Sequence, residues 1–159
     1  MDRIVVVLAV VAAIGSGLMG GFFFAFSNTV MGALGRLPPA QGIAAMQAIN
    51  VVVLNPLFFL AFFGTAALCL LLAGAGFWWG PLNPWLLLAA GLTYLIGCLG
   101  VTMVCNVPLN NELAAVQPDS AGAAALWSRY LETWTAWNHA RTAACVAAMA
   151  AFTIGLLES

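Results

Sequence analysis

The chain has 159 residues, of which 64% are hydrophobic and only 6% are charged, and its mean hydropathy is +1.06. Soluble globular domains carry about 25% charged residues, so this composition excludes a water-soluble protein and indicates an integral membrane protein. A formal net charge of −1 with only four Lys and Arg residues leaves no basic patch, which argues against a nucleic-acid partner. The length suits a single domain over residues 1–159.

Four apolar stretches are long enough to cross a bilayer, whose hydrocarbon core of about 30 Å needs about 20 helical residues. They lie at about residues 4–26, 51–73, 85–105 and 137–157. The sequence therefore predicts an all-α, multi-pass membrane protein built as a four-helix bundle. The first stretch is longer than the apolar core of a secretory signal, so we expect an uncleaved span. The few charged residues give conflicting indications of orientation across the bilayer.

Prolines divide two of the connecting segments. Pro38-Pro39 interrupts the first loop, and the residues after it predict a short helix that enters the second span. Pro118 interrupts the last loop and is followed by Asp119 and Ser120, either of which could cap the start of a helix. No proline follows, so we expect one long helix that begins outside the bilayer and continues into the fourth span.

Prolines and glycines also mark positions inside the spans. Pro56, near the start of the second span, and Pro108, at the end of the third, are expected to kink their helices. Gly17 and Gly21 have the G-x-x-x-G spacing of closely packed membrane helices. This spacing suits contact within the bundle or between subunits of a homo-oligomer, and the sequence does not choose between them.

Polar side chains gather at one end of the predicted bundle. With four spans, the ends of the first and third share a membrane face with the starts of the second and fourth. The polar residues at these four ends include Ser27, Gln47, Asn50, Asn55, Thr102, Asn106, Asn110, Asn138, His139 and Arg141. Amides are costly to bury without partners, so we interpret this end as a ligand or catalytic pocket. The alternative is a set of polar contacts that holds the helices together.

The stretch WTAWNHART, residues 134–142, concentrates the chemistry. His139 is the side chain that exchanges protons most readily near neutral pH. Arg141 lies about one turn inside the fourth span, where a charge is a functional candidate by default, and Glu112 and Glu132 are its expected partners. Together with Asn138, these side chains offer a base, a cation and an amide within two turns.

The sequence offers few ligands for a metal. It has a single His, and its four cysteines are not spaced as a zinc site. We therefore predict no metal and no cofactor, and we interpret Cys69, Cys98, Cys105 and Cys145 as small buried hydrophobic residues. The alternative that stays open is a bound haem with His139 as its ligand.

Three blocks of the sequence are similar to signature blocks of the anthrone oxygenase-like membrane family, much of which is catalogued as a domain of unknown function. They read GGFFFAFSNTVMGALGRLPPAQGIAAMQAINVVVLNPLF, VTMVCNVPLNNELA and LWSRYLETWTAWNHART. The resemblance implies oxidation of an anthrone, or a related phenolic or polycyclic aromatic compound, by O2 without metal or flavin. It also implies that His139 is the base.

The chemistry of the other polar residues suggests their roles in such a reaction. Arg141 and Asn138 are expected to stabilise the enolate that forms when the substrate loses a proton. The residues expected to bind the substrate are Gln47, Asn50, Asn55, Asn106, Asn110, Trp134 and Trp137. The alternative function is a non-enzymatic membrane module that binds a quinone, a lipid or a partner protein.

Overall fold

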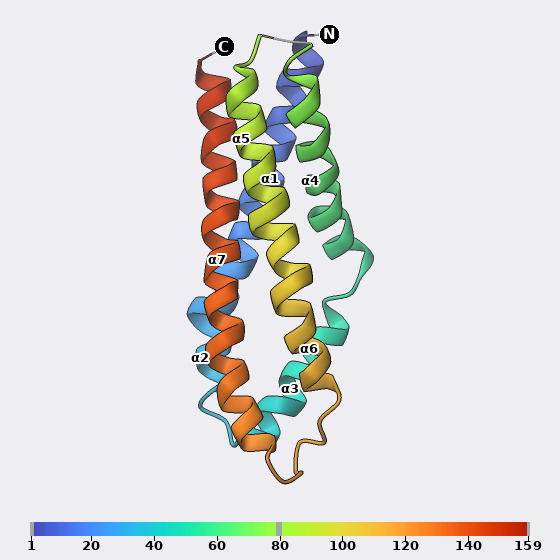
Figure 1. Ribbon diagram of the computed structural model, residues 1–159, viewed down its shortest axis with the longest axis vertical. Helices are drawn as coiled ribbons and strands as arrows, with labels where there is room; N and C mark the ends of the chain where they lie inside the picture. Colours follow the sequence, from blue (N-terminus) through green and yellow to red (C-terminus); the bar gives the residue numbers. More distant parts are fainter. Residues whose placement is uncertain (1, 79–80, 159) are drawn as a thin grey trace.

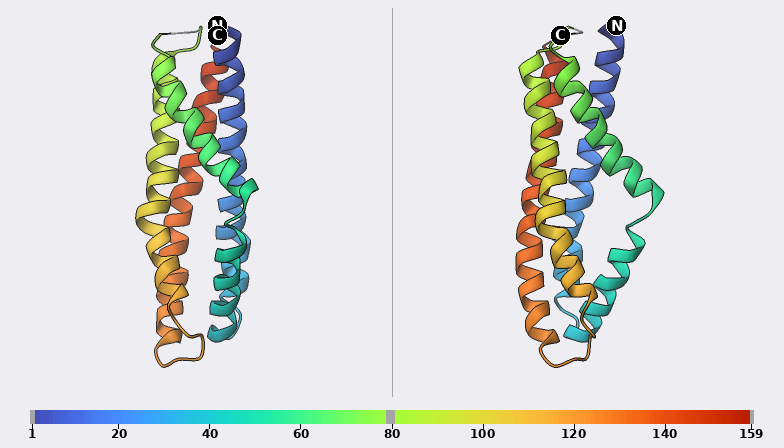
Figure 2. Two further views of the ribbon diagram at one scale, coloured as in Figure 1. Left: turned by 90° about the vertical axis from the view of Figure 1, so that its right-hand side faces the viewer. Right: turned by 45° about the vertical axis from the view of Figure 1, so that its right-hand side comes forward.

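The protein, represented by a computed structural model that describes residues 2–78 and 81–158, is a bundle of long helices (Figures 1 and 2). In this part of the chain all regular elements are α-helices or π-helical segments, the latter labelled η. In chain order they are α1 (Asp2–Ala25), η1 (Phe26–Val30), α2 (Met31–Leu34), α3 (Pro39–Val52), α4 (Pro56–Ala75), α5 (Pro84–Tyr94), η2 (Leu95–Gly100), η3 (Thr102–Asn106), α6 (Val107–Ala114) and α7 (Ala123–Leu157).

Four continuous helices are long and apolar enough to cross a membrane. They are Arg3–Leu34, which joins α1 to α2, Pro56–Ala75, which is α4, Pro84–Ala114, which joins α5 to α6, and Ala123–Leu157, which is α7. The prediction of an all-α bundle with four such helices is therefore confirmed, and the fold fits a multi-pass membrane protein.

The four helices differ in length, and this difference divides the molecule into two levels. α4 has 20 residues, or about 30 Å of helix, which matches the apolar thickness of a bilayer. α7 has 35 residues, or about 52 Å. All four helices have one end near the two chain termini (Figure 1). The other three therefore continue past the start of α4, where α3 packs beside them (Figure 2).

Each level has its own hydrophobic core. The core of the membrane level includes Met19, Phe23, Phe62, Leu72, Leu87, Tyr94 and Phe152. The core of the projecting level includes Met31, Ile43, Met46, Leu113, Trp127, Tyr130 and Trp134. Cys69, Cys98 and Cys145 are buried free thiols and Cys105 is half-buried, in keeping with the prediction that they act as small hydrophobic residues.

The connection before α4 differs from the prediction. The second span was expected to run through Pro56 with a kink, but α3 ends at Val52 and α4 begins at Pro56. Asn55 caps α4, because its Oδ1 accepts hydrogen bonds from the backbone N–H groups of Leu57 and Phe58 at 3.1 and 3.0 Å. Proline is well suited to the first position of a helix, so this pair starts a helix instead of bending one.

The other helix boundaries confirm some expectations and correct others. α3 begins at Pro39, and α7 runs without interruption to Leu157, both as predicted. Asp119 or Ser120 was predicted to cap the start of α7, but the residue directly before α7 is Gly122, whose φ is 87°. The Ser120 hydroxyl instead donates to the Gln117 carbonyl at 2.7 Å.

Pro108 and the glycine pair of α1 differ in part from their predicted roles. The helix continues through Pro108, and in place of a sharp kink it contains the π-helical segment η3, which ends at Asn106.

A Cβ on Gly17 would lie 2.7 Å from the Met149 sulfur, whereas one on Gly21 would meet nothing within 4 Å. Gly17 therefore serves contact between α1 and α7 within the bundle.

Gly91 lies at a close approach between α4 and α5, and this generates a prediction. A Cβ on Gly91 would lie 2.7 Å from the backbone oxygen of Cys69, and backbone atoms move aside less readily than side chains. We expect Gly91→Ala to lower the free energy of unfolding by about 1–3 kcal/mol, measured by thermal unfolding in detergent. Gly74→Ala is the control, because a Cβ there meets nothing within 4 Å. Equal stability of the two variants would contradict the close approach.

Candidate functional site

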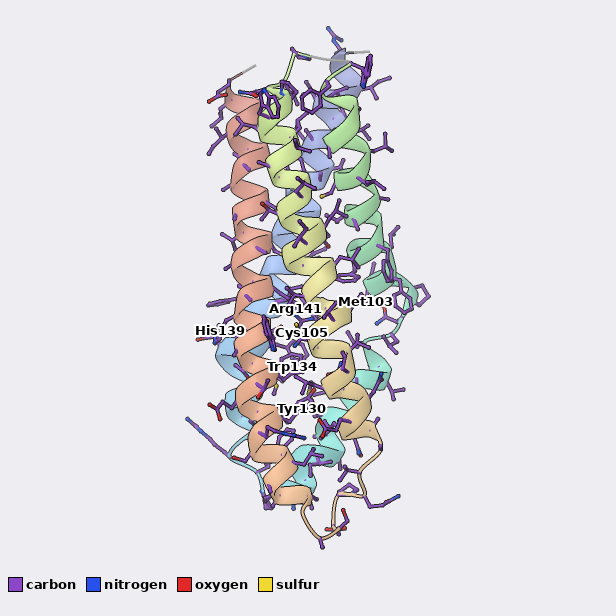
Figure 3. The ribbon with its side chains drawn as sticks, in the orientation of Figure 1. Met103, Cys105, Tyr130, Trp134, His139 and Arg141 are labelled. Carbon is purple, nitrogen blue, oxygen red and sulfur yellow. The ribbon has the colours of Figure 1, made fainter. Side chains whose placement is uncertain are left out.

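A buried guanidinium lies at the junction of the two levels. Arg141 is only 4% exposed and lies over the ring of Phe23, with 4.2 Å from its central carbon to the ring centroid. The corresponding distance to Trp134 is 5.2 Å. Its Nη1 donates to the Thr102 hydroxyl at 3.2 Å and its Nη2 to the Asn138 Oδ1 at 2.6 Å. Figure 3 shows this side chain between α7 and the helix formed by α5 and α6.

Arg141 has no carboxylate partner among the residues that the structure describes. Glu112 was an expected partner, but it forms an ion pair with the exposed Arg129. Glu132, the other expected partner, is exposed and lines a groove on the outer side of α7. Both expectations were wrong, because each carboxylate lies on a helix face that points away from the guanidinium. The cation is held by aromatic faces and neutral oxygens instead.

Asn138 joins α1 to the guanidinium. Its side chain is fully buried, and its Nδ2 donates to the Phe23 carbonyl at 2.6 Å and to the Ser27 hydroxyl at 2.5 Å. Because its Oδ1 accepts from Arg141, both ends of the amide are occupied. Asn138 therefore positions Arg141 and has little capacity left to bind a ligand directly.

Two buried polar atoms beside this network have no hydrogen-bond partner within residues 2–78 and 81–158. They are the Nε donor of Arg141 and the Oδ1 acceptor of Asn106. Asn106 is 1% exposed, and its Nδ2 donates to the Trp134 carbonyl at 3.2 Å. Buried polar groups are nearly always satisfied in folded proteins. An unpaired cationic donor and an unpaired acceptor suit a ligand that carries an anionic oxygen and a hydroxyl group.

Three polar side chains of the network around Arg141 lie on irregular helical turns. Ser27 belongs to η1, and Thr102 and Asn106 belong to η3. Such π-helical turns are uncommon and occur frequently at functional sites. The polar side chains that the first helix and the α5–α6 helix contribute to the network therefore lie on turns that depart from regular α-helix, whereas Phe23 lies on regular α1.

A second polar group lies below Trp134, toward the projecting level. The Asn110 Oδ1 accepts hydrogen bonds from the Tyr130 hydroxyl and from the Trp134 Nε1, both at 2.8 Å, and Asn50 also contacts the Tyr130 hydroxyl. Tyr130 stacks on Trp134 with ring centroids 6.1 Å apart. The structure thus brings Asn50, Asn106, Asn110 and Trp134 together as expected, although most of their polar atoms bind other protein groups.

His139 does not join this cluster, which corrects the expectation of one shared site. It is exposed and lies on the outer side of α7, away from Arg141 and Trp134 (Figure 3). It lines the outer groove, a shallow hollow of about 570 Å³ whose walls include Ser27, Met31, Glu132, Thr135, Ala136 and His139. Ser27 is the contact between the two places, because it lines this groove and accepts a hydrogen bond from Asn138.

Three further residues expected to bind substrate lie outside the cluster. Gln47 donates to the carbonyls of Leu113 and Val116 at 2.8 and 2.9 Å, so it ties α3 to the end of α6. Asn55 caps α4. Trp137 is 42% exposed. The side chains of Gln47 and Asn55 are therefore occupied by the backbone, and Trp137 faces away from the buried network.

An apolar hollow adjoins the cluster beside Phe26, whose ring contacts Trp134. This lateral groove has a volume of about 530 Å³ and is bounded by α1, α3 and α4. Its walls include Leu18, Phe22, Phe26, Val52, Phe58 and Ala61. The volume lies within the range of about 300–1,000 Å³ that is usual for small-molecule sites.

Sequence reasoning overlooked the aromatic side chains of α1. Phe22, Phe23 and Phe26 were interpreted only as part of an apolar span, but Phe23 lies under Arg141 and the other two line the lateral groove. The signal was present as a cluster of phenylalanines before a polar Ser-Asn-Thr run. Without the interior face of the helix, it could not be distinguished from ordinary membrane packing.

The fold and this cluster define a helical membrane protein with a buried cationic site beside an apolar groove. A family model described as anthrone oxygenase matches residues 58–151, which is more than half of the chain. The protein therefore belongs to the anthrone oxygenase family. The matched range contains Asn106, Asn138 and Arg141 but not α1 or α3. No curated protein and no solved structure gives a significant match.

The two neighbouring residues Asn138 and His139 should respond differently to mutation. Asn138→Leu removes the hydrogen bonds to the Phe23 carbonyl, to the Ser27 hydroxyl and to one arm of the Arg141 guanidinium, so we expect a loss of about 1–3 kcal/mol in the free energy of unfolding. His139→Leu changes an exposed side chain and should alter stability by no more than about 0.5 kcal/mol. Thermal unfolding in detergent measures both, and a larger effect at His139 would contradict the assigned burial.

Proposed function

We propose that this protein oxidises a flat, hydroxylated aromatic ketone of the anthrone type with O2, and that Arg141 stabilises the anion formed from the substrate. The observation that carries the proposal is a buried guanidinium with aromatic faces around it and no carboxylate partner among the described residues. Burying a lone charge is costly. A structural role would be served better by a neutral side chain, so a role in stabilising anionic charge accounts best for it.

The proposed reaction needs one oxidant, O2, and balances without another. Loss of a proton from the methylene carbon gives an enolate, which passes one electron to O2. The resulting carbon radical and superoxide combine, and uptake of a proton gives a hydroperoxide. Loss of water then forms the new carbonyl group. One oxygen atom of O2 enters the product, and the other leaves as water with the two methylene hydrogens.

The buried network can assist this chemistry in two ways. The Arg141 guanidinium favours the enolate over its neutral form, because a fixed positive charge in a water-poor site stabilises developing negative charge strongly. The unpaired Asn106 Oδ1 can accept a hydrogen bond from a ring hydroxyl group, which would fix the orientation of the substrate. Asn138 and Thr102 act as positioning residues that hold the guanidinium in place.

The route of the proton is a separate question. The role of base for His139 stays a prediction, because His139 and Arg141 lie on different sides of α7. A substrate in the outer groove could meet His139, but Glu132 lines the same groove and would repel an enolate. For a substrate bound beside Arg141, the guanidinium lowers the pKa of the substrate itself, so a weaker base suffices to accept the proton.

Substitution of Arg141 tests the proposed function. We expect Arg141→Met to lower the rate of O2-dependent anthrone oxidation by about 10²–10³-fold, the usual effect of removing an oxyanion-stabilising donor. The free energy of unfolding should change by no more than about 1–3 kcal/mol, because removal of a buried charge offsets part of the cost of leaving the Asn138 Oδ1 without its donor. The measurement is product formation and O2 uptake in membranes, after subtraction of spontaneous oxidation.

Arg129→Met is the matched control, because Arg129 is exposed and paired with Glu112. It should retain full activity. If Arg141→Met retains activity as well, Arg141 has no part in the reaction. If the wild-type protein oxidises no anthrone above background but releases a quinone or lipid into organic solvent, the non-enzymatic binding function is the better description.

Substitution of His139 tests the prediction that it is the base. Because its side chain lies outside the buried network, we expect His139→Ala to reduce turnover by less than about tenfold, whereas loss of a general base usually costs about 10²–10⁴-fold. The same assay measures this, at several pH values between about 5 and 8, where a histidine changes charge. A loss as large as that of Arg141→Met would establish His139 as the base and direct attention to the outer groove.

A further inference from the structure

The lateral groove lies at the depth of Arg141 and opens where an apolar molecule in the bilayer can reach it. Phe22 and Phe26, two of its wall residues, flank Phe23, the residue that lies under Arg141. Among its wall residues, Val52 is 73% exposed and Leu57 is 76% exposed. These apolar side chains lie near the start of α4, which marks one edge of the membrane level. An apolar compound dissolved in lipid can therefore enter sideways without crossing water.

The walls of this groove suit a flat aromatic molecule. Phe22 and Phe58 touch each other along its wall, with ring centroids 5.5 Å apart and planes tilted by 53°, and Phe58 stacks on Phe62 at 5.5 Å and 11°. Asn55 is the polar side chain in the lining, and its amide caps α4. Aromatic walls favour stacked or edge-on contact with another ring system, whereas the outer groove presents a carboxylate and hydroxyl groups.

Pairs of touching aromatic rings lie between the groove and Arg141. Phe22 touches Phe23, with centroids 5.7 Å apart, and Phe23 lies under the guanidinium. Phe26 touches Trp134 at 6.0 Å. Phe26 is also the first residue of η1 and is only half-buried, so its side chain has room to turn aside.

We propose that the ring system of the substrate binds in the lateral groove, and that Phe26 must turn away for the substrate oxygen to reach Arg141. This inference rests on the proposed function and adds the place and direction of substrate entry. It identifies Phe22 and Phe58 as the stacking surfaces for a compound of about three fused rings. Phe26 is a positioning residue that separates the bound rings from the cation.

Filling each groove in turn tests the binding place. Ala61→Trp places a large side chain in the lateral groove, and Ala136→Trp places the same side chain in the outer groove. The probe is a hydroxylated anthraquinone bound to purified protein in detergent, measured by its absorbance after gel filtration. We expect Ala61→Trp to raise the Kd at least about tenfold and Ala136→Trp to leave it unchanged. Ala48→Trp, on α3, repeats the first test from another wall.

The outcomes separate this inference from the proposed function. If Ala136→Trp weakens binding and Ala61→Trp and Ala48→Trp do not, the substrate binds in the outer groove and the inference is overturned while the oxidation stands. Full turnover in all three variants overturns it as well. If the two lateral-groove variants lose binding but wild-type protein shows no oxidation above background, the binding place stands and the proposed function fails.

Phe26 has a readout of its own. Phe26→Trp enlarges the side chain between the groove and Trp134, so we expect kcat to fall more than binding weakens, with the Kd for the anthraquinone within about twofold. Phe26→Leu introduces a smaller and more flexible side chain, so its kcat should be close to the wild-type value. Equal loss of kcat and binding in Phe26→Trp would mean that Phe26 forms part of the binding surface and does not separate it from Arg141.

Discussion

The burial of the Arg141 guanidinium is the constraint on which the rest of the structure depends. A charge at this depth costs several kcal/mol unless protein groups replace its water. Here α1 supplies the ring of Phe23, the α5–α6 helix supplies the Thr102 hydroxyl, and α7 itself supplies Asn138. Three of the four long helices must therefore meet at one depth, and the place where they meet is the junction between the two hydrophobic cores.

The lateral groove exists because of a local feature of the chain that is distant from Arg141 in the sequence. The Asn55-Pro56 pair ends one helix and starts the next, because proline has no N–H to continue a helix and Asn55 satisfies the first free N–H groups of α4. α3 and α4 consequently meet at an elbow that stands away from α1 (Figure 2). A straight helix at this position would pack along α1, so the break makes room for the hollow beside Phe22 and Phe26.

Membership of the anthrone oxygenase family and the geometry of the cluster support each other, but they rest on different residues. The family match spans residues 58–151 and includes the cation, its amide partner and Asn106. The aromatic residues of α1 that complete the surroundings of Arg141 lie outside that range. The site is therefore shared between the matched part of the chain and the first helix, with the Asn138 amide as the direct link to Phe23 and Ser27.

Composition and periodicity alone determined the all-α membrane fold, because four apolar stretches of sufficient length leave few other ways to satisfy the backbone in lipid. They also grouped Asn138, Arg141 and Trp134 on one face of α7. The sequence could not establish that this face points inward and that His139, about 200° around the helix from Arg141, points outward. Helical periodicity fixes the angle between two side chains, but only packing against α1 and the α5–α6 helix decides which of them is buried. The same packing decided that the cation rests on aromatic rings and neutral oxygens instead of a carboxylate.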